Sequence, residues 1–317
     1  MSFRILGAGG SHPSYVLTNE ELSGFLDTSD EWISQRTGIR ERAVCTDETL
    51  TDLLTQAADQ ALERAGITAQ ELDLILCATI RGDYITPSQA CVIQKEIGAS
   101  CPAMDISAAC TGFIYALDVA AGYFARKKVK KVLVLAGDCM TRMMDWSDRS
   151  TCVLFGDGAG AVVLGEGENL MAIQLTANGN VDVLNIPHVG GDSPFDKLPK
   201  NQSYLSMNGK EVYKFAVSSM YRDVQIVCDQ AGVKVEDVDW IVPHQANLRI
   251  IEAAAHKLKV SGEKCLTGIE NLGNTSAASI PIVLDRANTE GKFKAGDLLV
   301  LTAFGAGLTT GACVLRW

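Results

Sequence analysis

An internal repeat constrains this fold more than any other feature of the sequence. Residues 65–75 align with residues 231–241: in both, an Ala-Gly pair ends a predicted helix, an acidic turn follows, and an apolar strand begins. At the same offset, the apolar run at 132–137 aligns with the run at 298–303. A constant offset over several elements indicates a duplicated unit. Because helices alternate with apolar strands in both copies, each copy is expected to form a sheet covered by helices.

The duplication predicts two α/β halves, residues 1–165 and residues 166–317. The chain has 317 residues, 47% of them hydrophobic, which suffices for a large core. A segment rich in Gly, Pro, Asn and Ser at 178–208 interrupts the second half. We interpret this segment as an excursion that caps a site.

Composition excludes several classes of protein. No apolar run reaches the ~18 residues of a membrane span, and residues 1–10 are too short and Gly-broken for a signal peptide, so we expect no membrane association. The ten cysteines contain no Cys-x-x-Cys pair, so neither a disulfide framework nor a metal site is expected, and a reducing, cytoplasmic compartment fits best. The net charge of −10 argues against nucleic-acid binding.

Cys110 lies among small residues, directly before a long apolar run. Only Asp118 and Gly122 interrupt the apolar residues of 113–124, which predicts a helix buried on nearly all sides. A thiol at the first turn of a helix feels a partial positive charge, which is expected to lower its pKa and favour the nucleophilic thiolate. Free cysteines are, however, usually buried and inert. This stretch alone therefore leaves a nucleophile and a structural cysteine as alternatives.

Two polar residues of the second half occupy the ends of predicted elements. The strand at 238–242 leads to His244, and α/β folds gather catalytic groups at such strand ends. Asn274 precedes a predicted helix at 277–287. A structural hydrogen bond and an N-cap are the ordinary alternatives for these two residues. Pseudo-twofold packing would bring both to Cys110, whose counterpart at the repeat offset is Ser276. The remaining histidines, His12, His188 and His256, are expected to face solvent.

Taken together, these segments resemble β-ketoacyl-acyl carrier protein synthase III, the initiating condensing enzyme of fatty-acid synthesis in the thiolase superfamily. The matching motifs are Ser-Ala-Ala-Cys-x-Gly-Phe at 107–113, Gly-Asp-Gly-Ala-Gly-Ala at 156–161, Pro-His-Gln-Ala-Asn-Leu-Arg-Ile at 243–250 and Gly-Asn-Thr-Ser-Ala-Ala-Ser at 273–279. The resemblance covers essentially the whole chain. It implies a five-layered αβαβα fold of two thiolase-like halves, the first carrying the Cys and the second the His and Asn.

The resemblance implies a decarboxylative Claisen condensation of an acyl-CoA primer with malonyl-acyl carrier protein, without a cofactor. Cys110 would carry the acyl group as a thioester, and His244 and Asn274 would hold the enolate oxygen. Backbone N–H groups of Cys110 and Ala306 would form the oxyanion hole, with alanine where the family has glycine. A neutral His244 must present its Nε2–H, so its other nitrogen is expected to accept a hydrogen bond from the backbone.

Substrate contacts are also implied by the resemblance. A Trp face can stack on adenine, and arginines pair with phosphates; the implied CoA-binding residues are Trp32, Arg36, Arg149, Asn208 and Asn247. The acidic carrier protein would dock on basic residues, here Lys214, Arg249, Lys257 and Lys259. The acyl pocket would include Thr86, Met143, Met144, Phe155, Leu205 and Phe304, together with the excursion at 182–205. Family members are homodimers, so Thr86 would come from the neighbouring subunit.

Alternative functions also fit these residues. A relative that primes a polyketide or another specialised metabolite would carry the same Cys-His-Asn set. Thiolase-type cleavage fits less well, because such sites place a second cysteine in the C-terminal loop, whereas Cys313 falls within the last predicted strand. A non-catalytic acyl-CoA-binding scaffold would not need the intact set. The primer is not specified, although adaptable methionines in the pocket favour one longer than acetyl.

Overall fold

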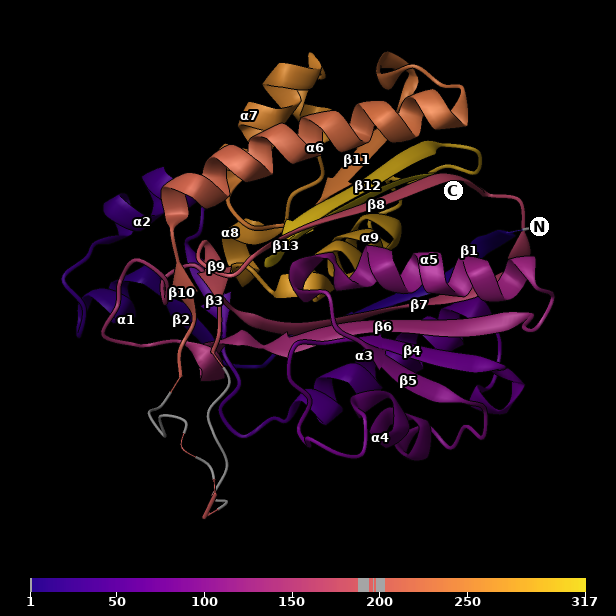
Figure 1. Ribbon diagram of the computed structural model, residues 1–317, viewed down its shortest axis with the longest axis horizontal. Coiled ribbons are helices and arrows are strands. Elements are labelled where there is room, and N and C mark those ends of the chain that lie inside the picture. The colour runs from indigo at the N-terminus through magenta and orange to yellow at the C-terminus, as the bar shows by residue number, and fades with distance from the viewer. Residues whose placement is uncertain (1, 188–193, 196, 198–202) are drawn as a thin grey trace.

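The computed structural model describes residues 2–187, 194–195, 197 and 203–317. His188 and parts of the excursion expected to cap the site (188–193, 196 and 198–202) lie outside the described residues. Figure 1 shows five layers, in which two sheets alternate with three layers of helices. This is the expected αβαβα architecture.

The two sheets repeat one strand order. The first runs β1 (Ser2–Ser11), β7 (Asp157–Gly167), β6 (Lys131–Cys139), β4 (Leu74–Ala78) and β5 (Ala103–Ile106). The second runs β8 (Leu170–Asn180), β13 (Gly307–Arg316), β12 (Leu298–Gly305) and β11 (Trp240–Pro243). β4 and β6 are parallel, as are β11 and β12, and the two remaining pairs of each series are antiparallel. The first sheet has one more edge strand, β5, which pairs in parallel with β4.

Helices cover both faces of each sheet (Figure 1). α3 (Leu50–Ala65) and α4 (Gln89–Glu96) lie outside the first sheet, and α6 (Gly209–Ala231) and α7 (Leu248–Leu258) lie outside the second. α5 (Gly112–Ala125) and α9 (Ser279–Thr289) form the central layer. The helix expected at 113–124 is therefore confirmed. Its burial follows from its place between two sheets.

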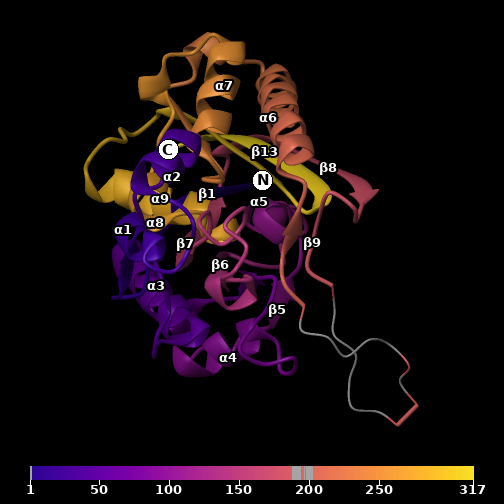
Figure 2. The same ribbon diagram turned by 90° about the vertical axis from the view of Figure 1, so that its left-hand side faces the viewer.

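The short elements gather at one end of the layers, which faces the viewer in Figure 2. They are α1 (Asn19–Ser23), α2 (Asp30–Thr37), α8 (Ile269–Leu272), β2 (Val16–Thr18), β3 (Glu41–Ala43), β9 (Leu184–Asn185) and β10 (Ser206–Met207). The short 3-10 turns are η1 (Ala69–Glu71), η2 (Ala109–Thr111), η3 (Met140–Met143), η4 (Val235–Asp237), η5 (Gly262–Lys264) and η6 (Ser276–Ala278). The last strand of the first sheet ends at Gly167, and the first strand of the second sheet begins at Leu170. The boundary between the two sheets therefore lies just beyond the expected division at 165/166.

The structure corrects the register of the repeat by one residue after its first strand. Leu74 of β4 pairs with Val132, whereas its counterpart Trp240 pairs with Leu299. Likewise, the left-handed backbone of Ala109 (φ 47°) recurs at Ser276 (φ 53°). Ser276 is therefore the counterpart of Ala109, and the expectation that it corresponds to Cys110 was wrong.

None of the helices formed by the described residues is long and apolar enough to cross a membrane.

Candidate active site

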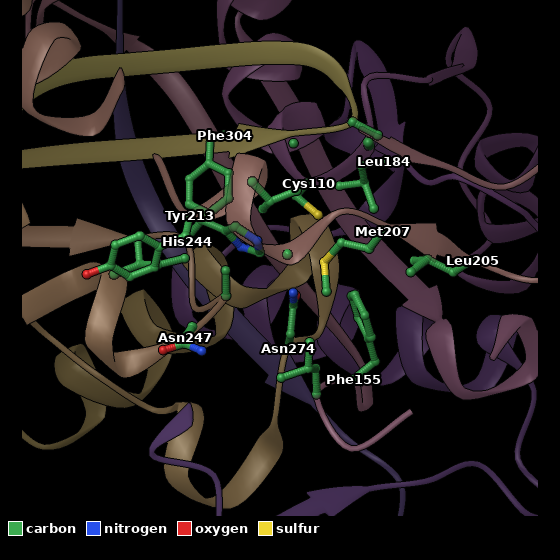
Figure 3. Close-up of a pocket in the computed structure, with 18 of the residues that line it drawn as sticks. Cys110, Phe155, Leu184, Leu205, Met207, Tyr213, His244, Asn247, Asn274 and Phe304 are labelled. Carbon is green, nitrogen blue, oxygen red and sulfur yellow. The ribbon is translucent and has the colours of Figure 1, made fainter. Parts of the chain in front are cut away.

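One cavity of about 700 Å³ brings together the three candidate catalytic side chains. Cys110 reaches it from η2, at the start of α5, His244 from the loop after β11, and Asn274 from the segment before η6. Figure 3 shows all three side chains directed into this cavity. Segments from both halves thus meet at one site, as pseudo-twofold packing requires.

Cys110 is the middle residue of the 3-10 turn η2 and is almost completely buried. Ala109, immediately before it, adopts a left-handed conformation that non-glycine residues seldom take. Burial raises the pKa of the Cys110 thiol to about 12, although the Ser276 hydroxyl, which donates to Sγ over 3.6 Å, opposes this rise. The expected lowering of the thiol pKa was therefore wrong, because the loss of solvation is the largest effect on this thiol.

His244 is buried and neutral. Burial lowers its pKa to about 3, because the charged imidazolium is poorly solvated there. Its Nδ1 lies 2.7 Å from the hydroxyl oxygen of Ser279, and its ring meets Phe304 edge-on with centroids 5.4 Å apart. The expected partner was a backbone group, so the Ser279 hydroxyl is a correction. Ser279 also accepts a hydrogen bond from the N–H of Gln245 (3.2 Å), which leaves its own proton for Nδ1.

Asn274 is oriented through both its main chain and its side chain. Its N–H donates to the carbonyl of Leu154 (2.8 Å), and its carbonyl accepts from Gly156 (3.1 Å). The side-chain Oδ1 accepts from the N–H of Ser276 at 2.9 Å. Because Oδ1 is engaged in this way, the amide nitrogen is the atom that points into the cavity (Figure 3).

The loop after β12 closes over Cys110. Gly305 lies so close that a Cβ there would come within 2.9 Å of the Cys110 nitrogen. Ala306 lines the cavity and does not adopt a positive φ, so alanine is accommodated at this position. Its carbonyl accepts from Thr309 Oγ1 (2.9 Å), and that hydroxyl lies 2.7 Å from Thr111 Oγ1. These two threonines tie the loop to the turn that carries Cys110.

The mouth of the cavity is basic in an otherwise acidic chain. Exposed cationic side chains line it: Arg36, Lys210, Lys214 and Arg249. Trp32 also lines the mouth, and the guanidinium groups of Arg36 and Arg149 lie 4.7 and 5.1 Å from its ring centroid. Arg149 pairs with Asp27 at 3.2 Å and is not itself part of the cavity wall.

Other candidate binding residues have structural contacts of their own. Asn247 lines the cavity, but its side chain caps α7 and donates to the carbonyl of Arg36 (3.0 Å). Asn208 is exposed, caps α6 and does not line the cavity. Lys257 lies away from the mouth, with its ammonium group 4.5 Å from the ring centroid of Tyr221. Lys259 ends α7 with a left-handed conformation.

The apolar wall contains half of the expected acyl-pocket residues. Phe155, Leu205 and Phe304 line the cavity. Met143 instead lines a second cavity of about 530 Å³, and Met144 is packed into the hydrophobic core without lining either cavity. Thr86 is exposed and lines neither cavity. Leu184 and Ile186, from the excursion at 182–205 that was expected to contribute, also line the cavity. Residues not singled out from the sequence complete the wall: Ile80, Met140 and Met207.

One cluster among the described residues could hold a metal ion. Cys45, Cys139 and Asp157 are buried with their ligand atoms within 4.8 Å of one another, and the two sulfurs are 3.4 Å apart. The Asp157 carboxylate already accepts from the N–H groups of Cys45 and Thr141 and from the Thr141 hydroxyl (2.6–2.8 Å). It therefore joins the start of β7 to η3 and to the segment that follows β3. None of the three residues lines the cavity that contains Cys110.

Comparisons with known proteins agree over the whole chain. The family described as 3-Oxoacyl-[acyl-carrier-protein (ACP)] synthase III matches residues 104–179, and its C-terminal family matches residues 228–317. Beta-ketoacyl-[acyl-carrier-protein] synthase III of Clostridium acetobutylicum is 45% identical, covering 100% of this chain and 99% of that relative. The crystal structure of the Aquifex aeolicus enzyme is 47% identical, with a TM-score of 0.93 over 99% of this chain and 100% of that one.

The chain belongs to the β-ketoacyl-acyl carrier protein synthase III family. It is accordingly a condensing enzyme of the acyltransferase type. The fold is likewise shared with a priming β-ketosynthase of the R1128 polyketide pathway, which is 34% identical with a TM-score of 0.93 over 99% of this chain and 96% of that one.

Several residues that support the site of this synthase III family member were missed from the sequence. Ser279 supports His244, Thr309 holds the Ala306 loop, and Asp138 lies buried next to Ser276. Ser279 belongs to the Gly-Asn-Thr-Ser-Ala-Ala-Ser motif, so that motif was the available signal. Thr309 and Asp138 carry no comparable signal, because their roles depend on contacts between distant segments.

Proposed function

We propose that this enzyme condenses an acyl-CoA primer with malonyl-acyl carrier protein through an acyl-Cys110 thioester, initiating fatty-acid synthesis. The observation that carries the proposal is the convergence of Cys110, His244 and Asn274 on one apolar cavity with a basic mouth. The names of the relatives support the choice of carrier protein as acceptor.

In the first half-reaction, the sulfur of Cys110 attacks the carbonyl carbon of the acyl-CoA. The new carbon–sulfur bond replaces the bond to CoA, and the thiol proton leaves with the CoA sulfur as CoA–SH. The backbone N–H groups of Cys110 and Ala306 stabilise the tetrahedral oxyanion. The close approach of Gly305 to the Cys110 nitrogen supports this pairing.

In the second half-reaction, malonyl-carrier protein loses carbon dioxide and becomes an enolate. The enolate carbon attacks the acyl carbonyl carbon, and the sulfur of Cys110 leaves as a thiolate that later takes a proton from solvent. His244 Nε2–H and the Asn274 amide donate to the enolate oxygen. The neutral state of His244 and the contact of its Nδ1 with Ser279 support an N–H at Nε2.

Both substrates carry negative charge, which matches the mouth of the cavity. Trp32 and Arg149 offer an aromatic face and a planar cation for the adenine, and Arg36 lies within reach of the phosphates. Lys214 and Arg249 are exposed at the mouth, where an acidic carrier protein would dock. Lys257 lies farther along α7, so its part in docking is secondary.

We also propose that the enzyme is a homodimer and that it works in a reducing cytoplasm. β5 is an edge strand, and close to it Ile85 is fully exposed. An unpaired edge strand beside an exposed apolar side chain is suited to pairing with a second copy. Such pairing would bring Thr86 to the partner's acyl pocket. All ten cysteines are unpaired, which is consistent with a reducing compartment.

Mass spectrometry of the intact enzyme after incubation with acyl-CoAs tests the proposal. We expect a thioester adduct on Cys110 that is absent in Cys110→Ser and clears with malonyl-carrier protein but not with malonyl-CoA. The primer that labels and clears fastest is the preferred one. If neither acetyl-CoA nor longer acyl-CoAs gave an adduct, the proposed condensation through a Cys110 thioester would be refuted.

A polyketide-priming role is the second candidate, supported by the likeness to the R1128 priming ketosynthase. The same assay separates the two roles when the carrier protein of fatty-acid synthesis is compared with one from a polyketide pathway. Faster clearance by the latter would favour the polyketide role.

A further inference from the structure

Two cysteines that are far apart in the sequence bring their sulfur atoms into contact outside the candidate active site. Cys139 ends β6, and Cys45 lies in the segment that follows β3, 94 positions earlier in the chain. A thiol hydrogen bond joins the two Sγ atoms over 3.4 Å. A disulfide bond is about 2.0 Å long, so an approach of roughly 1.4 Å would be enough to form one.

One carboxylate fixes the positions of both cysteines. Asp157 lies directly opposite Cys139 in the antiparallel pairing of β6 with β7. Its Oδ2 accepts a hydrogen bond from the N–H of Cys45 at 2.8 Å. Because Asp157 is completely buried, solvent does not compete for this bond. The contact between the two sulfurs therefore follows from the way in which β6, β7 and the segment after β3 are held together.

A small oxidant has a route to this pair through the second cavity. That cavity has a volume of about 530 Å³, and Cys139 and Arg142 both line it. It shares Ile80 and Ser107 with the cavity that contains Cys110, so the two cavities adjoin. A water molecule occupies about 30 Å³ in the liquid. The second cavity therefore has ample room for hydrogen peroxide, which has only two heavy atoms.

We propose that Cys45 and Cys139 form an oxidation site, at which hydrogen peroxide converts the two thiols reversibly into a disulfide. The Cys139 sulfur first attacks one peroxide oxygen; a sulfur–oxygen bond forms, the oxygen–oxygen bond breaks, and the thiol proton leaves with the other oxygen as water. The Cys45 sulfur then attacks the sulfenic sulfur of Cys139; the disulfide bond forms, the sulfur–oxygen bond breaks, and the Cys45 proton leaves with the hydroxyl group as water. Two thiols are oxidised, and one peroxide is reduced to two molecules of water.

The surroundings of the two thiols assign the order of these steps. The hydrogen bond with Cys139 and burial both raise the pKa of the Cys45 thiol, so Cys45 keeps its proton. Cys139 lines the second cavity and Cys45 does not, so Cys139 meets the oxidant first. The sulfenic acid is then in contact with Cys45, and this proximity favours the disulfide over further oxidation. Thiol–disulfide exchange returns the pair to two thiols in a reducing compartment.

Peptide mass spectrometry of the peroxide-treated enzyme tests this site. The remaining thiols are alkylated with iodoacetamide in denaturant, and the protein is digested without reduction. We expect a peptide that links Cys45 to Cys139 and that disappears after treatment with dithiothreitol. Cys91, which is partly exposed, provides an internal measure of exposure to the oxidant. The proposal would be overturned if Cys91 were fully oxidised while both members of the pair were recovered in alkylated form.

Two variants distinguish a specific pair from general oxidation of thiols. Cys45→Ser removes the second thiol, so the linked peptide should vanish and dimedone should capture a sulfenic acid at Cys139. Cys228→Ser is the matched control, since it removes a similarly buried thiol of α6 that lines neither cavity, and it should leave the linkage unchanged. Linkage of Cys139 to a cysteine other than Cys45 would contradict the proposal. Should Cys45→Ser fail to fold, Cys139→Ser provides a second variant that must abolish the linked peptide.

Discussion

At the scale of single residues, the candidate site depends on donors that stay neutral. Burial lowers the pKa of His244 to about 3, so the ring is uncharged throughout the physiological range. Asn274 cannot ionise, and its amide is held by the N–H of Ser276. Fixed neutral donors suit an oxygen that becomes negative only during decarboxylation, because they need no reorganisation when the charge appears.

His244→Ala and Asn274→Ala should each separate the two half-reactions. Both variants are expected to form the Cys110 thioester, since neither side chain belongs to the proposed oxyanion hole. Release of radiolabelled carbon dioxide from malonyl-carrier protein should fall by roughly 10²–10³-fold, the usual loss for one such donor. Near-normal decarboxylation in either variant would exclude that residue as a donor to the enolate.

Asp138 should impose a pH dependence on the stability of the fold. Burial raises its pKa to about 6, above the ordinary 3.8, so the folded state binds the proton more tightly than the unfolded state does. This contribution is complete below about pH 4 and is lost as the pH rises through 6. Urea unfolding of wild type and Asp138→Asn at pH 4 and pH 7 measures it. The advantage of wild type over the variant should shrink by on the order of 3 kcal/mol between these values, and a constant difference would contradict the assignment.

The three catalytic candidates could be predicted from the sequence more accurately than the residues that surround them. Cys110, His244 and Asn274 stand in motifs whose order and spacing are distinctive, and all three line the cavity. Met143 and Met144 were assigned to the same cavity, yet neither lines it. An apolar residue beside a site can face the cavity or the core, and composition does not distinguish the two. The raised pKa of Cys110 likewise could not be predicted from the sequence, because the burial of this thiol depends on residues from both halves.

At the scale of elements, α7 contributes Arg249 to the basic mouth. Asn247 caps the helix, and Arg249, which follows closely, is exposed at the cavity. Arg249→Glu is expected to raise the Michaelis constant for malonyl-carrier protein at least tenfold and to leave acyl transfer from CoA nearly unchanged. Lys257→Glu on the same helix is the matched control and should have a smaller effect, since that ammonium lies over Tyr221. Equal damage to both half-reactions by Arg249→Glu would argue against docking.

The elements also show why the repeat was recognised while its register was missed by one residue. α3 and α6 end at the predicted Ala-Gly turns, and α5 coincides with the predicted apolar helix. β6 and β12 are buried along nearly their whole length, so their sequences lack the alternation that fixes which residue faces which side. A shift by one residue leaves such apolar runs equally well aligned. The strand pairings were needed to determine it.

At the scale of the whole molecule, the first sheet ends in a strand suited to pairing. Ile85 is fully exposed, Tyr84 is largely exposed, and β5 pairs only with β4 among the described strands. We expect the enzyme to sediment as a dimer at micromolar concentration and Ile85→Asp to shift it towards monomer, because a buried charge opposes association. A monomeric wild type would contradict the dimer, and with it the assignment of Thr86 to a neighbouring acyl pocket.

The central layer of helices has a consequence for how the enzyme loses its structure. Backbone amides of α5 and α9 lie between two sheets, and the turns that carry Cys110 and Ser276 begin these helices. Water can reach the amides of the buried residues of these helices only when the sheets separate, so the hydrogen–deuterium exchange of those amides should require the full free energy of global unfolding. The candidate site would then have no partly loosened state of its own: it is either fully assembled or lost together with the fold.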